Sequence, residues 1–295
     1  MIFGLFEMFC RFIPNNYSQK AQNISKNFNL AEVLIFGNSH TFYGMNPKYF
    51  LKPTFNISNV SQTLYFDNLL FENFIDKFTA VKTIVLNVDY FTLSEIDNCE
   101  EDNWRKYYYE YYYQLQVPTI NKYNYQRYLL SATRDFNSNL KLTWRFIKEG
   151  TIVDCDELGF GNNYTFEKKG HLNPTDIVQR AKSHEDSSLN LEKNKLRLQK
   201  IIAICKAKKI KVILVTMPVM SGYSAAVNQN KLATIVTVCK NLEVTNSHVY
   251  YLNLFRDTQI DDTDFFDADH LHNRGAAKCS IIVNDYITHI IASAK

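Results

Sequence analysis

The amino-acid sequence predicts a three-layer α/β domain, in which helices cover both faces of a parallel sheet. Short apolar runs rich in β-branched residues recur along the chain, and amphipathic helical patterns lie between them. These runs are continuous rather than alternating, which is typical of parallel strands buried on both faces. A chain of 295 residues that is 46% hydrophobic is long enough to bury such a core.

Five segments carry the strand pattern, and helical patterns separate them. The predicted strands are 32–37, 54–58, 81–91, 211–219 and 248–255. Apolar residues from 62 to 78 fall near one face of a helix, and a second helix around 201–205 precedes the fourth strand. A last helix begins near Asn273 or Gly275. Strand and helix therefore alternate at both ends of the chain.

The alternation stops between about 99 and 184, which we interpret as an aromatic-rich helical insertion. The strand pattern resumes afterwards without a linker, so residues 31–295 are predicted to form one domain. Tyrosines 107–109 and 111–113 run around a predicted helix of this insertion. They are expected to pack the insertion onto the core; the alternative is a lid or a carbohydrate-stacking wall of the cleft.

Residues 1–30 form a separate N-terminal segment. Its first 13 residues are mostly apolar but include Glu7 and Arg11, and they are fewer than the roughly 20 that span a bilayer. A signal-peptide pattern is not evident. We therefore expect a helix that lies on the domain or makes peripheral contact with a membrane surface.

Charge and cysteine spacing exclude two classes of protein. The net charge of +3 arises from 33 basic and 30 acidic residues that are mostly scattered, so nucleic acid is not an expected partner. The six cysteines lie far apart and form no C-x-x-C pair, which argues against a zinc knuckle or a small disulfide scaffold.

The stretch "VLIFGNSH" ends an apolar strand with polar residues. A strand that ends in this way delivers the hydroxyl of Ser39 to the carboxyl edge of the sheet, where open α/β folds bind their ligands. Ser39 is therefore a candidate nucleophile; alternatively it caps the following helix. His40 is expected to pack or bind at the first helical turn rather than to act as a base.

The string "DADHLH" near the end of the chain supplies a candidate base. Asp267 and His270 are three residues apart, so the carboxylate can orient the imidazole and stabilise its protonated form. Asp269, which is adjacent to His270, is expected to point away. A metal site built from Asp267, Asp269, His270 and His272 is the alternative. The early strand ends present Asn38, Ser39, His40 and Asp89 rather than the further ligands usual in a metal-dependent phosphoesterase, so no metal is predicted.

Together, "GNSH", "DADH" and the α/β alternation resemble the SGNH hydrolases, also called GDSL-type esterases, in particular the envelope-associated branch that modifies bacterial polysaccharides. The resemblance covers about 31–95 and 185–295. It implies a flavodoxin-like fold that needs no cofactor, with Ser39 as nucleophile, His270 as base and Asp267 as the orienting acid. It also favours a location at the cell envelope.

The resemblance further implies an oxyanion hole, for which the candidates are Ser39, Ser61, Asn59 and Asn87. Ser61 stands by position where the family has a glycine, with Asn59 close by. Asn87 stands for an asparagine that normally follows a glycine, and Asn38 replaces an aspartate found in many members. The oxyanion hole is where this sequence departs most from the family.

We therefore expect a serine esterase or O-acyltransferase that acts on O-acetyl or other O-acyl groups of a carbohydrate. Two alternatives remain: a catalytically inactive glycan-binding or assembly protein on the same fold, and a metal-dependent phosphoesterase. The expected partner is a carbohydrate or another acylated small substrate.

Overall fold

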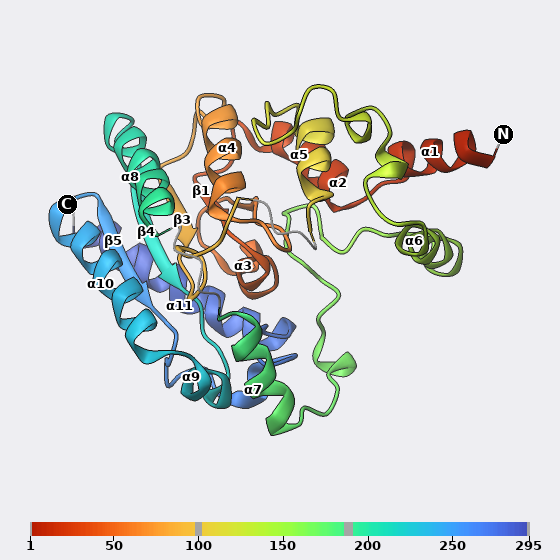
Figure 1. The fold of residues 1–295 in the computed structure, drawn as a ribbon. Helices are drawn as coiled ribbons and strands as arrows, with labels where there is room; N and C mark the ends of the chain where they lie inside the picture. Colours follow the sequence, from red (N-terminus) through yellow and green to blue (C-terminus); the bar gives the residue numbers. More distant parts are fainter. Residues whose placement is uncertain (1, 98–101, 186–190, 294–295) are drawn as a thin grey trace.

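The computed structural model describes residues 2–97, 102–185 and 191–293. Five parallel strands form one sheet in the order β2-β1-β3-β4-β5 (Figure 1). In chain order the strands are β1 (Val33–Phe36), β2 (Thr54–Asn56), β3 (Thr83–Asn87), β4 (Lys211–Thr216) and β5 (Val249–Asn253). Each lies within one of the five predicted segments. The order 2-1-3-4-5 is that of flavodoxin-like folds, which confirms the predicted fold class.

The centre of the sheet is fully buried, as its apolar strands require. Every residue of β1 and β3 is buried, and β1 lies between β2 and β3. Val33 is aligned with Thr54 on one side and with Thr83 on the other. The carboxyl ends of β1 and β3 therefore lie next to each other at one edge of the sheet.

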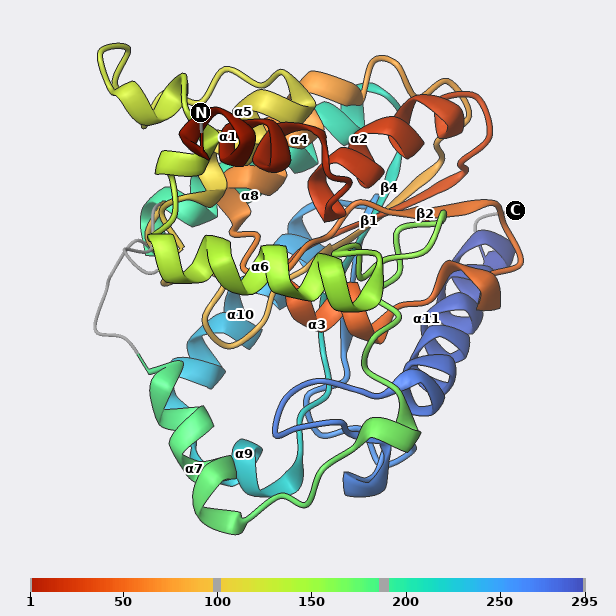
Figure 2. The same ribbon diagram turned by 90° about the vertical axis from the view of Figure 1, so that its right-hand side faces the viewer.

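Helices cover both faces of the sheet. α3 (Ser39–Gly44) packs against α11 (Asn273–Ser293), and α4 (Leu64–Phe74) packs against α8 (Leu191–Ala207). α10 (Gln229–Thr245) packs against β5 after the short α9 (Ser221–Ala226). Figure 2 shows α10 and α11 on opposite sides of the sheet. The helices predicted around 62–78, 201–205 and after 273 thus correspond to α4, α8 and α11.

The region between β3 and α8 holds three helices, α5 (Arg105–Tyr113), α6 (Phe136–Glu149) and α7 (Pro174–Ser183). Residue 99, where the insertion is predicted to begin, lies outside the described residues. Short 3-10 turns complete the chain at Pro47–Tyr49, Tyr125–Arg127, Leu130–Ala132, Phe166–Lys168 and Asp262–Asp264. The α/β alternation is therefore interrupted by helices and loops, and no sheet strand lies among the described residues of this region.

Most tyrosines of α5 are core residues. Tyr107, Tyr108, Tyr109 and Tyr113 are each less than 5% exposed. The rings of Tyr108 and Tyr109 meet Tyr17 of α2 (Asn16–Asn27) edge to face, at centroid distances of 5.3 and 5.1 Å. Tyr109 also stacks on Phe66 of α4 at a centroid distance of 4.1 Å, so these side chains pack the insertion onto the core, as the first of the two interpretations predicts.

The first helix, α1 (Ile2–Phe12), is bonded to the insertion. The Glu7 carboxylate accepts hydrogen bonds from the backbone N–H groups of Leu130 and Ser131 at 3.1 and 2.9 Å. It also forms an ion pair with Arg11, one turn along the helix. Among the described residues no helix combines the length and apolar character needed to cross a membrane.

Candidate active site

The turn after β1 presents Ser39 and requires the glycine before it. Gly37 has a φ of +135°, and a Cβ atom added there would lie 2.4 Å from the Cβ of Asn87. Asn38 is the N-cap of α3, because its Oδ1 accepts a hydrogen bond of 2.9 Å from the backbone N–H of His40. The capping role considered for Ser39 thus belongs to its neighbour, which leaves the Ser39 hydroxyl for another contact.

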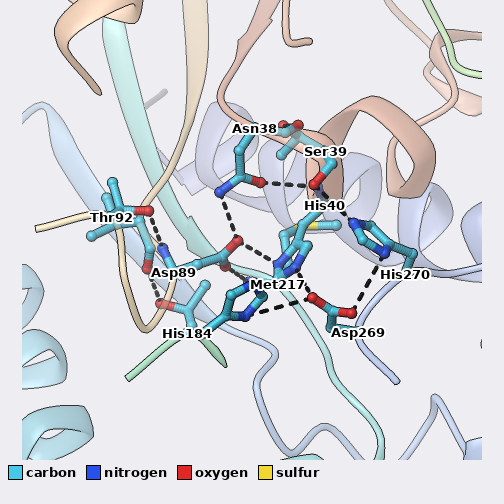
Figure 3. A network of polar contacts seen from close by, with 12 residues as sticks. Asn38, Ser39, His40, Asp89, Thr92, His184, Met217, Asp269 and His270 are labelled. Carbon is cyan, nitrogen blue, oxygen red and sulfur yellow. Dashed lines mark hydrogen bonds and ion pairs between the residues drawn. The ribbon is translucent and has the colours of Figure 1, made fainter. Parts of the chain in front are cut away.

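Ser39, His270 and Asp267 lie in one line of hydrogen bonds. Ser39 Oγ is 2.8 Å from His270 Nε2 (Figure 3). His270 Nδ1 is 2.9 Å from each carboxylate oxygen of Asp267. With Nδ1 donating to Asp267, Nε2 is left as an acceptor for the serine proton. The two ends of the chain therefore meet at the carboxyl edge of the sheet.

The loop before α11 fixes this geometry. Asp267 Oδ1 also accepts from the backbone N–H groups of Asp269 and His270, at 3.1 and 2.8 Å, which closes a tight turn around the carboxylate. His272 faces the other way: its Nδ1 accepts from the backbone N–H groups of Arg274 and Gly275 at the start of the helix. His272 is therefore a helix cap and does not join the cluster.

The expectation that Asp269 points away is wrong. Its side chain is fully buried, and Oδ1 lies 3.5 Å from His270 Nδ1. Oδ2 lies 3.0 Å from His40 Nε2, and Arg180 Nε donates to Oδ1 at 3.0 Å. The carboxylate points inward because His40 and Arg180 bind it there. Neither partner can be inferred from the position of Asp269 next to His270 in the sequence.

His40 joins Asp269 to Asp89, a carboxylate just beyond the end of β3. His40 Nδ1 is 2.6 Å from Asp89 Oδ2, and all three side chains are nearly or fully buried (Figure 3). Burial alone would lower the pKa of His40, but the two carboxylates outweigh it and raise that pKa to about 10. The two carboxylates therefore favour the imidazolium form of His40 at neutral pH.

The carboxylates on either side of His40 remain ionised. Burial would raise the pKa of Asp89, but the His40 imidazolium outweighs it and lowers that pKa. Asp269 behaves likewise: its interactions with His270, His40 and Arg180 hold its pKa well below the usual range against the effect of burial. Asp89 also accepts a hydrogen bond of 2.8 Å from the backbone N–H of Met217, after β4.

Arg180 of α7 and His184, which follows the last residue of that helix, complete the network from the insertion. Besides Arg180, His184 places its Nδ1 2.6 Å from the hydroxyl of Tyr223 and 3.7 Å from Asp269 Oδ2. Burial lowers the pKa of His184 to about 3, so this imidazole is neutral. Sequence reasoning missed both, because nothing in the pattern around α7 suggests partners about 90 residues away. Asp89 could have been identified as a site residue from the sequence, because it is a carboxylate just after a buried strand.

Three side chains of this cluster are also close enough to hold a metal ion. His40, Asp269 and His270 each offer a ligand atom, and these atoms lie within 4.8 Å of one another. An imidazole binds a metal through an unprotonated nitrogen, so a metal here would have to replace one of the two contacts of His40 with Asp89 and Asp269.

The candidates for the oxyanion hole differ in their contacts with the turn that carries Ser39. Asn59 donates its backbone N–H to Gly37 O at 3.2 Å, and its side-chain Nδ2 is buried with no hydrogen-bond partner among the described residues. Asn87 lies against Gly37, as its Cβ contact shows. Ser61 has a φ of +52°, a conformation that favours glycine and is strained for serine. Asn87 Nδ2 is likewise buried with no hydrogen-bond partner among the described residues, so both asparagines stay candidates for the side-chain donor.

A cavity of about 330 Å³ opens beside the imidazole. It is lined by Tyr164, Leu172, Asp176, Arg180, Asp267, Ala268, Asp269 and His270. Tyr164 stacks on Tyr43 at a centroid distance of 3.9 Å and on Phe266 at 4.1 Å, and both tyrosine rings meet His270 edge to face. His270 and Asp267 therefore border this cavity, and Tyr164 is the aromatic residue among those that line it.

Comparison with known proteins yields likeness of structure only. No family model matches the sequence, and no curated protein matches it. The fold is similar to a solved "putative acylhydrolase" from Bacteroides fragilis, with 13% identity, a TM-score of 0.45, and coverage of 92% of this chain and 95% of the other. It is also similar to a GDSL-like lipase from Bacteroides thetaiotaomicron, with 12% identity, a TM-score of 0.43, and coverage of 93% and 99%.

The strand order and the site of Ser39 define the fold more firmly than these distant likenesses. The chain has a flavodoxin-like α/β fold, with the GNSH turn after its first strand and the DADH loop before its last helix, as the SGNH resemblance implies.

Proposed function

We propose that the protein is a serine esterase or O-acyltransferase that acts on O-acyl groups of a carbohydrate. One observation carries the proposal: Ser39 Oγ lies 2.8 Å from His270 Nε2, whose other ring nitrogen lies 2.9 Å from Asp267. A serine hydroxyl is a weak nucleophile at its free pKa, and a base within hydrogen-bond reach is what activates it.

The reaction follows from this arrangement. Ser39 Oγ attacks the acyl carbonyl while His270 Nε2 takes its proton, and Asp267 stabilises the resulting imidazolium. The tetrahedral intermediate collapses to an acyl-serine ester as His270 returns the proton to the leaving sugar oxygen. Water or a second hydroxyl then attacks the acyl-serine, with His270 again moving the proton, and Ser39 is regenerated.

The cavity beside His270 supports a carbohydrate as the leaving group. Because His270 protonates the leaving oxygen, the alcohol part of the ester belongs on its side of Ser39. Tyr164 lines this cavity, and its ring is held by stacking on Tyr43 and Phe266. An aromatic lining residue offers apolar contact to sugar C–H groups. The arginine and aspartates of the cavity are available to sugar hydroxyls.

The test is an ester assay with three arms. Hydrolysis of 4-nitrophenyl acetate and release of acetate from acetylated xylan are measured for the wild type, for Ser39→Ala, and for the wild type with a chelator. We expect Ser39→Ala to lose activity by about 10³-fold or more, with the chelator without effect. Loss with chelator alone would instead identify a metal enzyme.

A wild type inactive towards both esters, yet able to bind the glycan, would identify a binding protein on this fold.

A further inference from the structure

A second cavity lies beside the nucleophile turn and carries an excess of positive charge. It measures about 290 Å³, and we call it the arginine cavity. Its charged lining residues are Arg105, Arg134, Arg145 and Asp154. Tyr43, Asn59, Trp104 and Tyr108 are among the other residues that line it. Three guanidinium groups thus face one carboxylate.

Two of these arginines are already paired. Arg145 donates two hydrogen bonds to the Asp154 carboxylate, one of them 3.0 Å long. Arg105 donates to the hydroxyl of Tyr17 at 2.9 Å and forms an ion pair of 3.1 Å with Asp102. Asp154 and Asp102 are thus paired with Arg145 and Arg105, and neither forms an ion pair with Arg134.

Arg134 is the unpaired cation. Its guanidinium carbon lies 3.3 Å from the centre of the Trp104 ring, and it makes no hydrogen bond or ion pair with any described residue. Its Nε is buried, and burial lowers the pKa of Arg134. Arg134 is partly buried and stacks on the Trp104 ring, but no acidic group of the described residues neutralises its charge, which leaves the guanidinium able to bind an anion.

Asn59, one of the oxyanion candidates, also lines the arginine cavity and has a free donor. Its side chain is only 1% exposed, and Nδ2 has no hydrogen-bond partner among the described residues. Its Oδ1 is already bonded to the backbone N–H of Val60, so the free group is a donor. Asn59 Nδ2 and the Arg134 guanidinium both line this cavity, and both would bind a hydrogen-bond acceptor that carries negative charge.

We propose that the arginine cavity binds an anionic group, a carboxylate or a phosphate, of the acylated substrate. The proposal rests on the proposed function and names its substrate class: an acyl ester of a glycan that carries acidic groups. Arg134 would supply the charge, Asn59 a further donor, and Trp104 an aromatic wall for the adjoining sugar ring.

The cavity adjoins the candidate catalytic residues through two residues. Tyr43, four positions after Ser39 on α3, lines the cavity and also meets the His270 ring at a centroid distance of 5.6 Å. Asn59 lines it and is bonded to Gly37, two positions before Ser39. A glycan with its ester at Ser39 could therefore place a neighbouring acidic group in the cavity.

Binding is tested first, without catalysis, in the Ser39→Ala protein. Its melting temperature is followed in sodium phosphate, in sodium glucuronate and in sodium chloride at equal ionic strength; the two anions distinguish phosphate from carboxylate. We expect at least one to raise the melting temperature in a concentration-dependent way, since ligands that bind only the folded state stabilise it. Adding Arg134→Gln should abolish most of that increase.

Two further variants serve as controls for the binding test. Arg127→Gln removes the same charge from an ion pair with Glu110 elsewhere in the insertion, and should leave the increase intact. Arg134→Lys keeps the charge but loses the planar fork, and should retain part of it. No increase above that in chloride, or an equal increase in Arg134→Gln, would overturn the proposal.

Catalysis is tested second, by comparing acetylated polygalacturonate with acetylated xylan. The wild type should prefer the acidic polymer, and Arg134→Gln should reduce that preference by about tenfold, the loss expected for one charged hydrogen bond. An unchanged preference contradicts the proposal. If Ser39→Ala still releases acetate, the proposed function is wrong. The melting-temperature measurements then still show whether the arginine cavity binds an anion.

Discussion

At the scale of single residues, two neighbouring aspartates have different tasks. Asp267 is about one-third exposed and touches His270 through both oxygens, whereas Asp269 is fully buried and is shared among His40, Arg180 and His270. The exposed carboxylate orients the candidate base. The buried one balances charge inside the protein. Substitution of Asp267 should therefore lower activity, whereas substitution of Asp269 should lower stability.

We expect Asp267→Asn to keep its stability and lose activity. The amide can offer His270 Nδ1 an N–H instead of an acceptor, which favours the wrong imidazole tautomer. A loss of up to about 10⁴-fold in kcat is expected, by comparison with serine proteases. Kinetics on 4-nitrophenyl acetate and urea unfolding of the same preparation provide the measurement.

Asp269→Asn should instead unfold easily. It leaves the His40 imidazolium and the Arg180 guanidinium without their shared buried partner, and breaking a buried ion pair costs about 3 to 5 kcal/mol. The free energy of unfolding, measured in urea, should fall by that order. Equal activity losses at positions 267 and 269, with no difference in stability, would contradict the division of tasks.

At the scale of elements, His40 connects the start of α3 with the end of β3 and the loop before α11. His40→Asn should remove the cation that lies between Asp89 and Asp269 and cost about 3 kcal/mol or more of unfolding free energy. His171→Asn, at an exposed histidine, is the matched control. A double variant with Asp89→Asn should cost less than the sum of the two single variants. Additive losses would show that the pair is not coupled.

The elements were predictable where the sequence pattern is local. Continuous apolar runs locate β1 to β5, and the D-x-x-H spacing brings Asp267 and His270 onto one turn. The inward direction of Asp269 was not predictable, because its partner Arg180 is 89 positions away on α7. The catalytic roles of Ser39, His270 and Asp267 remain predictions for the assays above.

At the scale of the whole molecule, a buried hydrogen-bond chain joins the insertion to the nucleophile turn. Tyr109 on α5 donates to Gln62, Gln62 donates to Asp67 Oδ1 at 2.7 Å, and the same oxygen accepts from Gly37 N–H at 3.0 Å. Burial raises the pKa of Asp67 to about 7, although both donors oppose it. The insertion is thus bonded to the core through an ionisable group.

The raised pKa of Asp67 predicts how the free energy of unfolding changes with pH. Between about pH 4 and 7 the folded protein holds a proton on Asp67 that the unfolded chain releases, so stability from this group falls as pH rises and levels off above pH 7. Asp67→Asn can keep both hydrogen bonds through its Oδ1 and removes the titration. The wild type should therefore lose up to about 4 kcal/mol relative to the variant across that range. A constant difference in urea unfolding from pH 4 to 8 would contradict this account.

The contact between Ser39 and His270 joins residues 231 positions apart. During synthesis, Ser39 leaves the ribosome long before His270, and α11, which packs against α3, comes later still. Long-range pairings of this kind form late, after the chain segments between them have been made. The nascent chain therefore carries a serine without its base, and any esterase activity must begin only after the DADH loop has emerged and docked.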